Sequence, residues 1–136
     1  MVSKVVHSRK TDEYVTPWNL YDELNKEFNF DLDVAATHEN AKCRLYYTKE
    51  EDGLLCKWGG SVWCNPPYSK NYAWCEKAFR ERRNCENIVM LLPSRTDTKW
   101  WHEFVMRAYE RRFIKGRVHF NELPFGAPFP SVIVVW

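Results

Sequence analysis

Pro66 and Pro67 end the short apolar run at residues 61–64, and this boundary limits what the chain can fold into. Neither proline can donate a backbone hydrogen bond to a sheet, and each holds its own φ angle near one value. A residue that precedes a proline is also pushed towards extended backbone. We therefore predict a strand at 61–64 that ends in a stiff loop formed by Asn65, Pro66, Pro67 and Tyr68.

This loop holds an amide and a phenol in a fixed geometry at the mouth of a sheet. The Asn65 Oδ1 atom and the Pro66 carbonyl oxygen can each accept one N–H of a planar amino group. The Tyr68 ring can lie flat on the heterocycle that carries the amine, and such stacking is worth roughly 1–3 kcal/mol per base. The candidate catalytic residues are therefore Asn65, Pro66, Pro67 and Tyr68.

Helical and strand patterns alternate along the rest of the chain. Thr16 suits the N-cap of a first helix and Pro17 its first helical position. The predicted helices are 17–28, 72–83 and 98–109, and the predicted strands are 30–36, 45–48, 61–64, 87–92, 112–114, 117–120 and 132–136, with a turn at 115–116. This order favours an α/β fold with a mostly parallel sheet and an antiparallel C-terminal hairpin.

The ends of two predicted strands indicate where a ligand binds. In sheets of this kind, ligands bind outside the carboxyl ends of the strands, where the strand order reverses. The strand at 30–36 ends in Ala35 and Ala36, and the strand at 61–64 is followed by Asn65. If these strands are neighbours at the reversal, both loops face one crevice.

Length and composition are typical of one globular domain with a single core. We expect residues 14–136 to form this domain and residues 1–13 to be loose. No stretch has the length of a transmembrane helix, and residues 1–10 lack the apolar run of a signal peptide, so we expect a cytoplasmic protein. The five cysteines form no C-x-x-C pair and no cluster with the four histidines. We therefore expect reduced thiols and no metal site.

Positive charge is concentrated after the proline loop. Residues 76–117 hold eleven Lys or Arg against six Asp or Glu, which suits a polyanionic partner but equally an exposed helix surface. Arg95, Lys99 and Arg117 lie in loops after strands or near turns and are the candidate phosphate contacts. Phe129, with Phe125 as the alternative, is the candidate second aromatic over a base, although both can instead cap the edge of the core.

An ordered set of short motifs resembles the phage-type DNA N-6-adenine methyltransferases. The set covers roughly residues 14–136 and comprises TP at 16–17, DLDVAA at 31–36, NAKC at 40–43, YYT at 46–48, DGL at 52–54, VWCNPPYS at 62–69, LLP and RTDT within 91–98, and GRV and Phe120 within 116–120. A match to NPPY alone is moderately specific. The ordered set is far more specific.

This resemblance implies a compact Rossmann-like fold, S-adenosylmethionine as methyl donor and a flipped adenine of double-stranded DNA as acceptor. It implies that the methionine end of the cofactor meets Thr16, Pro17, Asp33, Ala35 and Ala36. Asp52 is the best candidate for the cofactor ribose hydroxyls, with Glu50 or Glu51 next. The first loop has alanines where the wider superfamily has glycines, and a positive φ would cost more there.

We expect no separate target-recognition domain within these 136 residues, and a homodimer is one arrangement we consider. If the gene is phage-borne, the protein is expected in the host cytoplasm. Two other functions stay open on the residues alone. The same amide chemistry would serve methylation of an RNA base or of a protein glutamine side chain. A non-catalytic nucleic-acid-binding module with the same fold is the alternative of another class.

Overall fold

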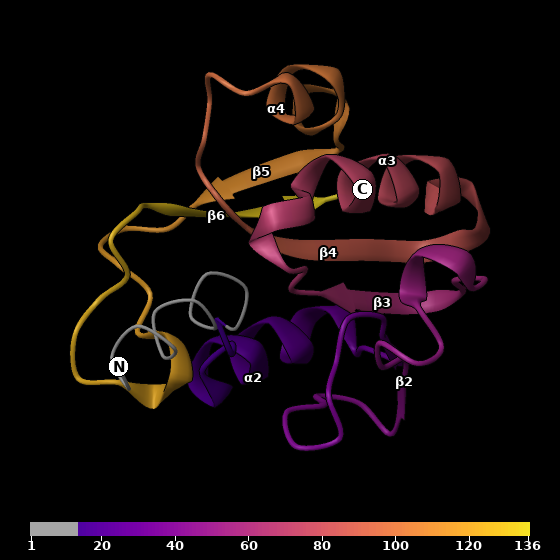
Figure 1. Cartoon of the computed structure of the whole chain (residues 1–136), viewed down its shortest axis with the longest axis horizontal. Helices are drawn as coiled ribbons and strands as arrows, with labels where there is room; N and C mark the ends of the chain where they lie inside the picture. Colours follow the sequence, from indigo (N-terminus) through magenta and orange to yellow (C-terminus); the bar gives the residue numbers. More distant parts are fainter. Residues whose placement is uncertain (1–13) are drawn as a thin grey trace.

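The computed structural model describes residues 14–136, so the predicted loose segment 1–13 lies outside the described residues. A six-stranded sheet in the order β2-β1-β3-β4-β6-β5 forms the centre of the molecule (Figure 1). Its strands are β1 (Leu32–Asp33), β2 (Leu45–Tyr46), β3 (Gly60–Cys64), β4 (Cys85–Pro93), β5 (Glu110–Phe113) and β6 (Ser131–Val135). The helices are α2 (Trp18–Phe28), α3 (Asn71–Glu81) and α4 (Lys99–Glu103).

The sheet is mostly parallel and ends in an antiparallel pair, as predicted. β1 pairs in parallel with β2 and β3, and β3 pairs in parallel with β4. β6 runs antiparallel to both β4 and β5. The α/β class is therefore confirmed.

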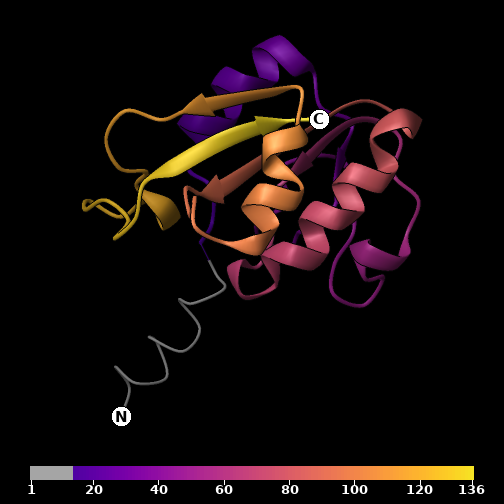
Figure 2. The same cartoon turned by 90° about the horizontal axis from the view of Figure 1, so that it is seen from above.

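Helices cover both faces of the sheet. Successive residues of the buried strand β4 point to opposite faces, so they pack into two separate clusters. Ile88, Met90 and Leu92 belong to the cluster that packs under α3 and α4. Val89 and Leu91 belong to the cluster that packs against α2 and the connection between β5 and β6. Figure 2 shows α3 and α4 side by side over one face, with α2 on the opposite side.

Two predicted elements near the N-terminus are shorter in the structure. Pro17 occupies the N-cap position and α2 begins at Trp18, so the prediction of Thr16 as N-cap was one residue too early. β1 holds only Leu32 and Asp33 of the predicted strand 30–36. Extended backbone continues beyond it, since the Val34 N–H donates to the Trp63 carbonyl at 3.2 Å.

Of the predicted strand-turn-strand unit at 112–120, the first strand is present as β5 and the second strand at 117–120 is wrong. β5 pairs with β6, and residues 117–119 form no strand. Val118 and Phe120 are both buried, so their alternation resembles that of a strand. They fill the α2 side of the core without a partner strand. The predicted helix 98–109 is also too long, because α4 ends at Glu103 and a separate 3₁₀ turn follows at Val105–Arg107.

All five cysteines are free thiols, two of them (Cys64 and Cys75) fully buried. Across residues 14–136, no helix combines the length and the apolar character needed to cross a bilayer.

Candidate active site

The strand order reverses between β1 and β3, and a cavity opens there. Asp33 of β1 lies opposite Trp63 of β3, so the loops that follow both strands emerge at the same edge of the sheet. As expected, the two loops open onto one cavity, which has a volume of about 350 Å³. That volume lies within the usual range of roughly 300–1,000 Å³ for small-molecule sites.

Most of the predicted cofactor-binding residues line this cavity. They are Thr16, Asp33, Ala35, Ala36 and Asp52, whereas Pro17 does not line it. Of the predicted catalytic loop, Asn65 and Pro67 line the cavity, whereas Pro66 and Tyr68 do not. The structure thus brings together the segment at 14–16, which precedes α2, and three loops that are far apart in the sequence.

The Asn65 amide is held in one orientation. Its Nδ2 atom donates to the Tyr14 carbonyl oxygen and, at 3.0 Å, to the Thr16 Oγ1 atom. Its Oδ1 atom is buried and has no hydrogen-bond partner among residues 14–136. A buried acceptor without a donor costs about 1–3 kcal/mol. An N–H donor that reached this acceptor would remove that cost.

Tyr68 is fixed at both ends of its side chain. Its hydroxyl donates to the Leu91 carbonyl oxygen at 3.0 Å. Burial raises the pKa of Tyr68 well above its usual value, so the phenol stays neutral. Its ring stacks on Tyr14, with 5.5 Å between ring centroids and 21° between planes. Phe120 and Phe129 meet the Tyr68 ring edge-on, so aromatic side chains surround the predicted base-stacking residue.

Asp33 is a buried carboxyl group at the cavity wall. Its Oδ1 atom accepts from the Ala35 N–H at 3.3 Å, and its Oδ2 atom accepts from the Lys42 N–H at 3.0 Å. Burial raises the pKa of Asp33 to about 6, because loss of hydration outweighs these two bonds and the nearby Lys42 charge. The carboxyl group therefore titrates close to neutrality.

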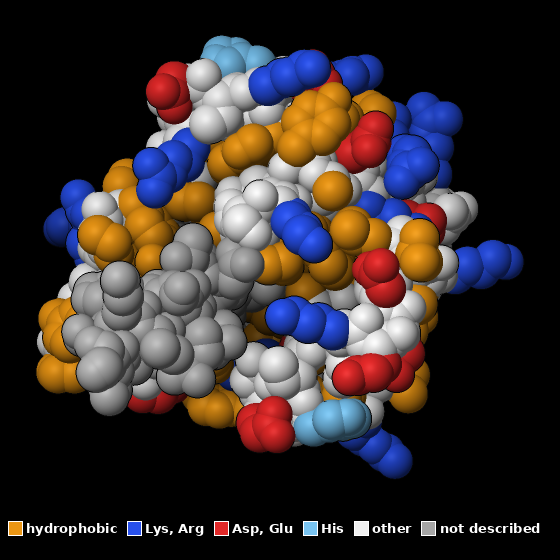
Figure 3. Space-filling model, viewed as in Figure 1, with side chains coloured by type: hydrophobic (Ala, Val, Ile, Leu, Met, Phe, Trp, Pro, Cys, Tyr) orange, Lys and Arg blue, Asp and Glu red, His pale blue; other side chains and the backbone are white. Residues whose placement is uncertain are grey.

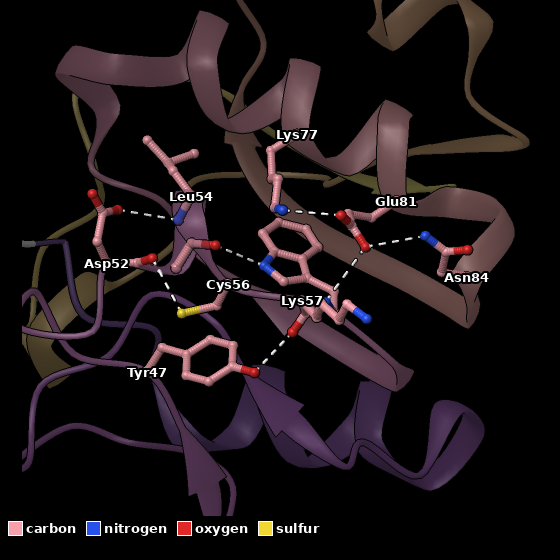
Figure 4. A network of polar contacts seen from close by, with 10 residues as sticks. Tyr47, Asp52, Leu54, Cys56, Lys57, Lys77, Glu81 and Asn84 are labelled. Atoms are coloured by element: carbon pink, nitrogen blue, oxygen red, sulfur yellow. Dashed lines mark hydrogen bonds and ion pairs between the residues drawn. The ribbon is translucent and has the colours of Figure 1, made fainter.

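The turn at Asp52 and Gly53 presses against the first loop. The Asp52 Oδ1 atom caps the following 3₁₀ turn by accepting from the Leu54 N–H at 3.1 Å, and the Gly53 carbonyl accepts from Trp58 Nε1 at 2.9 Å (Figure 4). A Cβ atom on Gly53 would lie 2.1 Å from the Val34 carbonyl oxygen. Only glycine lets the turn come this close to the Val34 backbone. The close contact places Asp52 at the cavity wall.

Glu50 and Glu51, the next candidates after Asp52, do not line the cavity. Both carboxylates accept from the Thr48 hydroxyl, at 2.7 and 2.8 Å. The hydroxyl bond lowers the pKa of Glu50, and the pKa of Glu51 is lowered first by the Thr48 N–H, which donates to its Oε1 atom at 2.7 Å, and then by the hydroxyl. Asp52 is thus the acid of this group that reaches the site.

The candidate nucleic-acid contacts lie outside the cavity. Arg95 is exposed with its guanidinium 5.8 Å from the Phe129 ring, and Arg117 donates to the Ala127 carbonyl at 3.3 Å. Lys99 pairs with Glu103 at 3.7 Å on α4. Phe129 is buried, whereas the alternative Phe125 is 58% exposed. Figure 3 shows Lys and Arg side chains dispersed over one face, with Asp and Glu between them.

Reasoning from the sequence missed Tyr14, whose carbonyl and ring meet Asn65 and Tyr68. An aromatic residue two positions before the Thr16-Pro17 pair was the available signal. Among residues 14–136, no group of three or more His, Cys, Asp or Glu side chains is arranged to hold a metal ion.

Comparison with known proteins gives a consistent result. The family model described as DNA N-6-adenine-methyltransferase (Dam) matches residues 3–129. A DNA N-6-adenine-methyltransferase of Escherichia phage T1 is 35% identical over 102 residues, which cover 73% of this chain and 43% of the relative. One of Haemophilus phage HP1 is 32% identical over 125 residues, covering 88% of this chain and 70% of the relative. The putative methyltransferase YfdM of Escherichia coli K12 is 36% identical over 76 residues, covering 48% of this chain and 84% of the relative.

The chain thus spans less than half of the phage T1 relative but more than two thirds of the phage HP1 relative. The family match covers every residue that lines the cavity, from Tyr14 to Trp74. On this evidence, the chain belongs to the DNA N-6-adenine-methyltransferase (Dam) family.

Proposed function

We propose that this chain transfers a methyl group from S-adenosylmethionine to N6 of adenine in DNA. The observation that carries the proposal is the Asn65 Oδ1 atom, a buried acceptor without a partner among the described residues, at the cavity where the strand order reverses. The names of the phage relatives support the same activity.

The cavity residues fit S-adenosylmethionine. The cavity volume is adequate for one nucleoside-sized ligand. We propose that Asp33 meets the ammonium group of the methionine end, with Thr16, Ala35 and Ala36 around it. Asp52 would accept from the ribose hydroxyls. When bound, the cofactor supplies a methyl group on a positively charged sulfur atom.

The proposed role of the proline loop is to orient the target amine. The lone pair of adenine N6 is delocalised into the ring, so the nitrogen is a poor nucleophile. Asn65 Oδ1 and the Pro66 carbonyl would each accept one of its N–H groups and favour a pyramidal nitrogen. Orientation and preorganised dipoles then supply the rate, and no strong general base is required before the transfer.

The target adenine would leave the duplex to reach this loop, at a cost of a few kcal/mol. Stacking on Tyr68 would offset part of that cost. Tyr14 covers the Tyr68 ring in the free protein, so we propose that its side chain moves when the base enters. Phe129, buried edge-on to both rings, would form the wall of the base site.

Methylation assays on three substrates test this function. The purified protein is incubated with labelled S-adenosylmethionine and with double-stranded DNA, RNA or a glutamine-containing peptide. We expect label in DNA alone, as N6-methyladenine that sequencing can map. Label in RNA or peptide alone would favour the alternative substrates. Absence of S-adenosylmethionine binding by calorimetry would favour a non-catalytic binding module.

Cofactor affinity is expected to depend on pH through Asp33. The ammonium group would bind the ionised carboxylate, and the pKa of Asp33 in the free protein is about 6. Affinity should therefore fall as the pH drops below about 6, by up to about tenfold per pH unit. Calorimetry between pH 5 and 7.5 measures this. Asp33→Asn should bind weakly with a flat profile, and a flat wild-type profile would contradict the contact.

Arg95 is expected to contribute one phosphate contact. Arg95→Ala should weaken binding to every DNA sequence alike and lower the slope of log affinity against log salt by about 0.9. Fluorescence anisotropy at several salt concentrations measures the slope. Arg80→Ala, at an exposed arginine of α3, is the matched control and should leave the slope unchanged. Equal slopes for Arg95→Ala and wild type would remove Arg95 from the interface.

A further inference from the structure

Two consecutive residues in the connection between β5 and β6 adopt an unusual backbone. Asn121 and Glu122 both have positive φ angles, 61° and 57°, and neither is glycine. Few non-glycine residues adopt this left-handed backbone conformation. Those that do are mostly Asn or Asp, whose short polar side chains can bond locally, so Glu is rarer there. Such a conformation persists only where surrounding contacts hold it, and it often marks a functional constraint.

These two residues, which we call the latch, hold the segment that enters α2. The Val15 N–H donates to the Asn121 Oδ1 atom at 2.9 Å, and the Asn121 N–H donates to the Val15 carbonyl at 2.8 Å. The Glu122 Oε2 atom accepts from the Trp18 N–H at 2.8 Å, at the start of the helix. A carboxylate at this position also suits the positive end of the helix dipole.

The opposite edge of the same segment holds the Asn65 amide. Tyr14 and Thr16 supply the two acceptors for Asn65 Nδ2. Backbone polar groups of successive residues in an extended chain point to alternate sides. Residues 14–16 therefore bond to Asn121 through the Val15 backbone on one side, and to Asn65 through the Tyr14 carbonyl and the Thr16 hydroxyl.

The latch also borders the aromatic group at the base site. Phe120, which directly precedes Asn121, contacts the Tyr14 ring edge-on with 5.2 Å between centroids. Phe120 is buried, whereas both latch residues are exposed. Exposed residues that bond across more than 100 positions contribute little to the core, so their contacts serve the segment that they hold.

We propose that Asn121 and Glu122 are positioning residues for methyl transfer, an inference that rests on the proposed function. Through Val15 and Trp18 they hold Tyr14 and Thr16 in place, and these two residues keep Asn65 Oδ1 aimed at the target amine. Without the latch, the segment shifts, the Asn65 amide loses its fixed partners, and its acceptor is no longer held in the reactive geometry.

A pair of substitutions at Asn121 separates this role from a structural one. Asn121→Gly removes the side-chain acceptor and accommodates the positive φ, so the backbone is not strained. Asn121→Asp keeps an acceptor oxygen at the same place. We expect kcat to fall about 5–50-fold in Asn121→Gly, since small misplacements of catalytic groups have effects of this order. Asn121→Asp should stay within about twofold of wild type.

The assays are run well below the thermal midpoints of all three proteins, with kcat and KM measured separately. Wild-type kcat in Asn121→Gly, or an equal loss in both variants, would overturn the proposal. Glu122→Gln, which keeps the acceptor oxygen, and Glu122→Ala, which removes it, should repeat the pattern with a smaller effect.

A second readout does not depend on catalysis. The Asn65 side-chain amide signals, assigned in ¹⁵N spectra by their loss in Asn65→Ala, should shift and broaden in Asn121→Gly but not in Asn121→Asp. Unchanged signals in Asn121→Gly would refute the proposed role of the latch in positioning Asn65. If the wild-type protein methylates no DNA while these signals change as expected, the proposed function fails, but the finding that Asn121 positions the Asn65 amide stands.

Discussion

Asn65→Ala is expected to reduce methyl transfer to DNA by at least about 100–1,000-fold, the range found when one preorganised polar group is removed from a catalytic site. The variant loses the Oδ1 acceptor for the target amine and the Nδ2 donor to Tyr14 and Thr16. Single-turnover assays measure the transfer, and calorimetry measures cofactor affinity. Affinity should change far less than the rate, because most of the cavity wall is untouched.

Asn71→Ala is the matched control. Asn71 also has a buried Oδ1 atom without a hydrogen-bond partner among residues 14–136, but it lies at the start of α3 and does not line the cavity. Its replacement should alter stability at most. Asn65→Asp, which keeps an acceptor oxygen, should retain more activity than Asn65→Ala. Methylation by Asn65→Ala within tenfold of wild type would show that another group orients the amine.

Gly53→Ala is expected to disrupt both the fold around the cavity and cofactor binding. The new Cβ atom would lie 2.1 Å from the Val34 carbonyl oxygen and 2.9 Å from the Trp74 ring. The carbonyl belongs to the backbone of the first loop, so the clash cannot be relieved by rotating a side chain. Overpacking of this kind costs about 1–3 kcal/mol or more. The thermal midpoint should fall by roughly 3–15 °C.

Gly59→Ala tests whether this effect is local. A Cβ atom at Gly59 would meet nothing within 4 Å. Differential scanning fluorimetry with and without S-adenosylmethionine compares the two variants. Gly53→Ala should lose the stabilisation that the cofactor gives by binding the folded state, and Gly59→Ala should keep it. Equal thermal midpoints and equal cofactor-induced shifts in both variants would mean that the loop at Val34 moves to accept the new Cβ atom without loss of stability.

The contrast between β3 and the 112–120 region shows how far local sequence carries a fold prediction. β3 ends where two prolines remove backbone donors, and this rule acts within a few residues. The β5–β6 pairing joins residues about 20 positions apart, and the alternation of Val118 and Phe120 equally suited a strand. Which segment pairs with β5 depends on the segments that lie beside it in the folded protein. A local sequence pattern does not contain that information.

The sequence by itself determined the stiff Asn65–Tyr68 loop, the buried central strand β4 and the chemistry of the residues around the crevice. These follow from proline geometry and from the burial of apolar runs, which act locally. Only the tertiary structure decided the direction of the Asn65 amide, the Tyr14 ring over Tyr68 and the grip of Asn121 on Val15. Those contacts join segments 49 to 106 positions apart, so they exist only once the sheet has brought its loops to one edge.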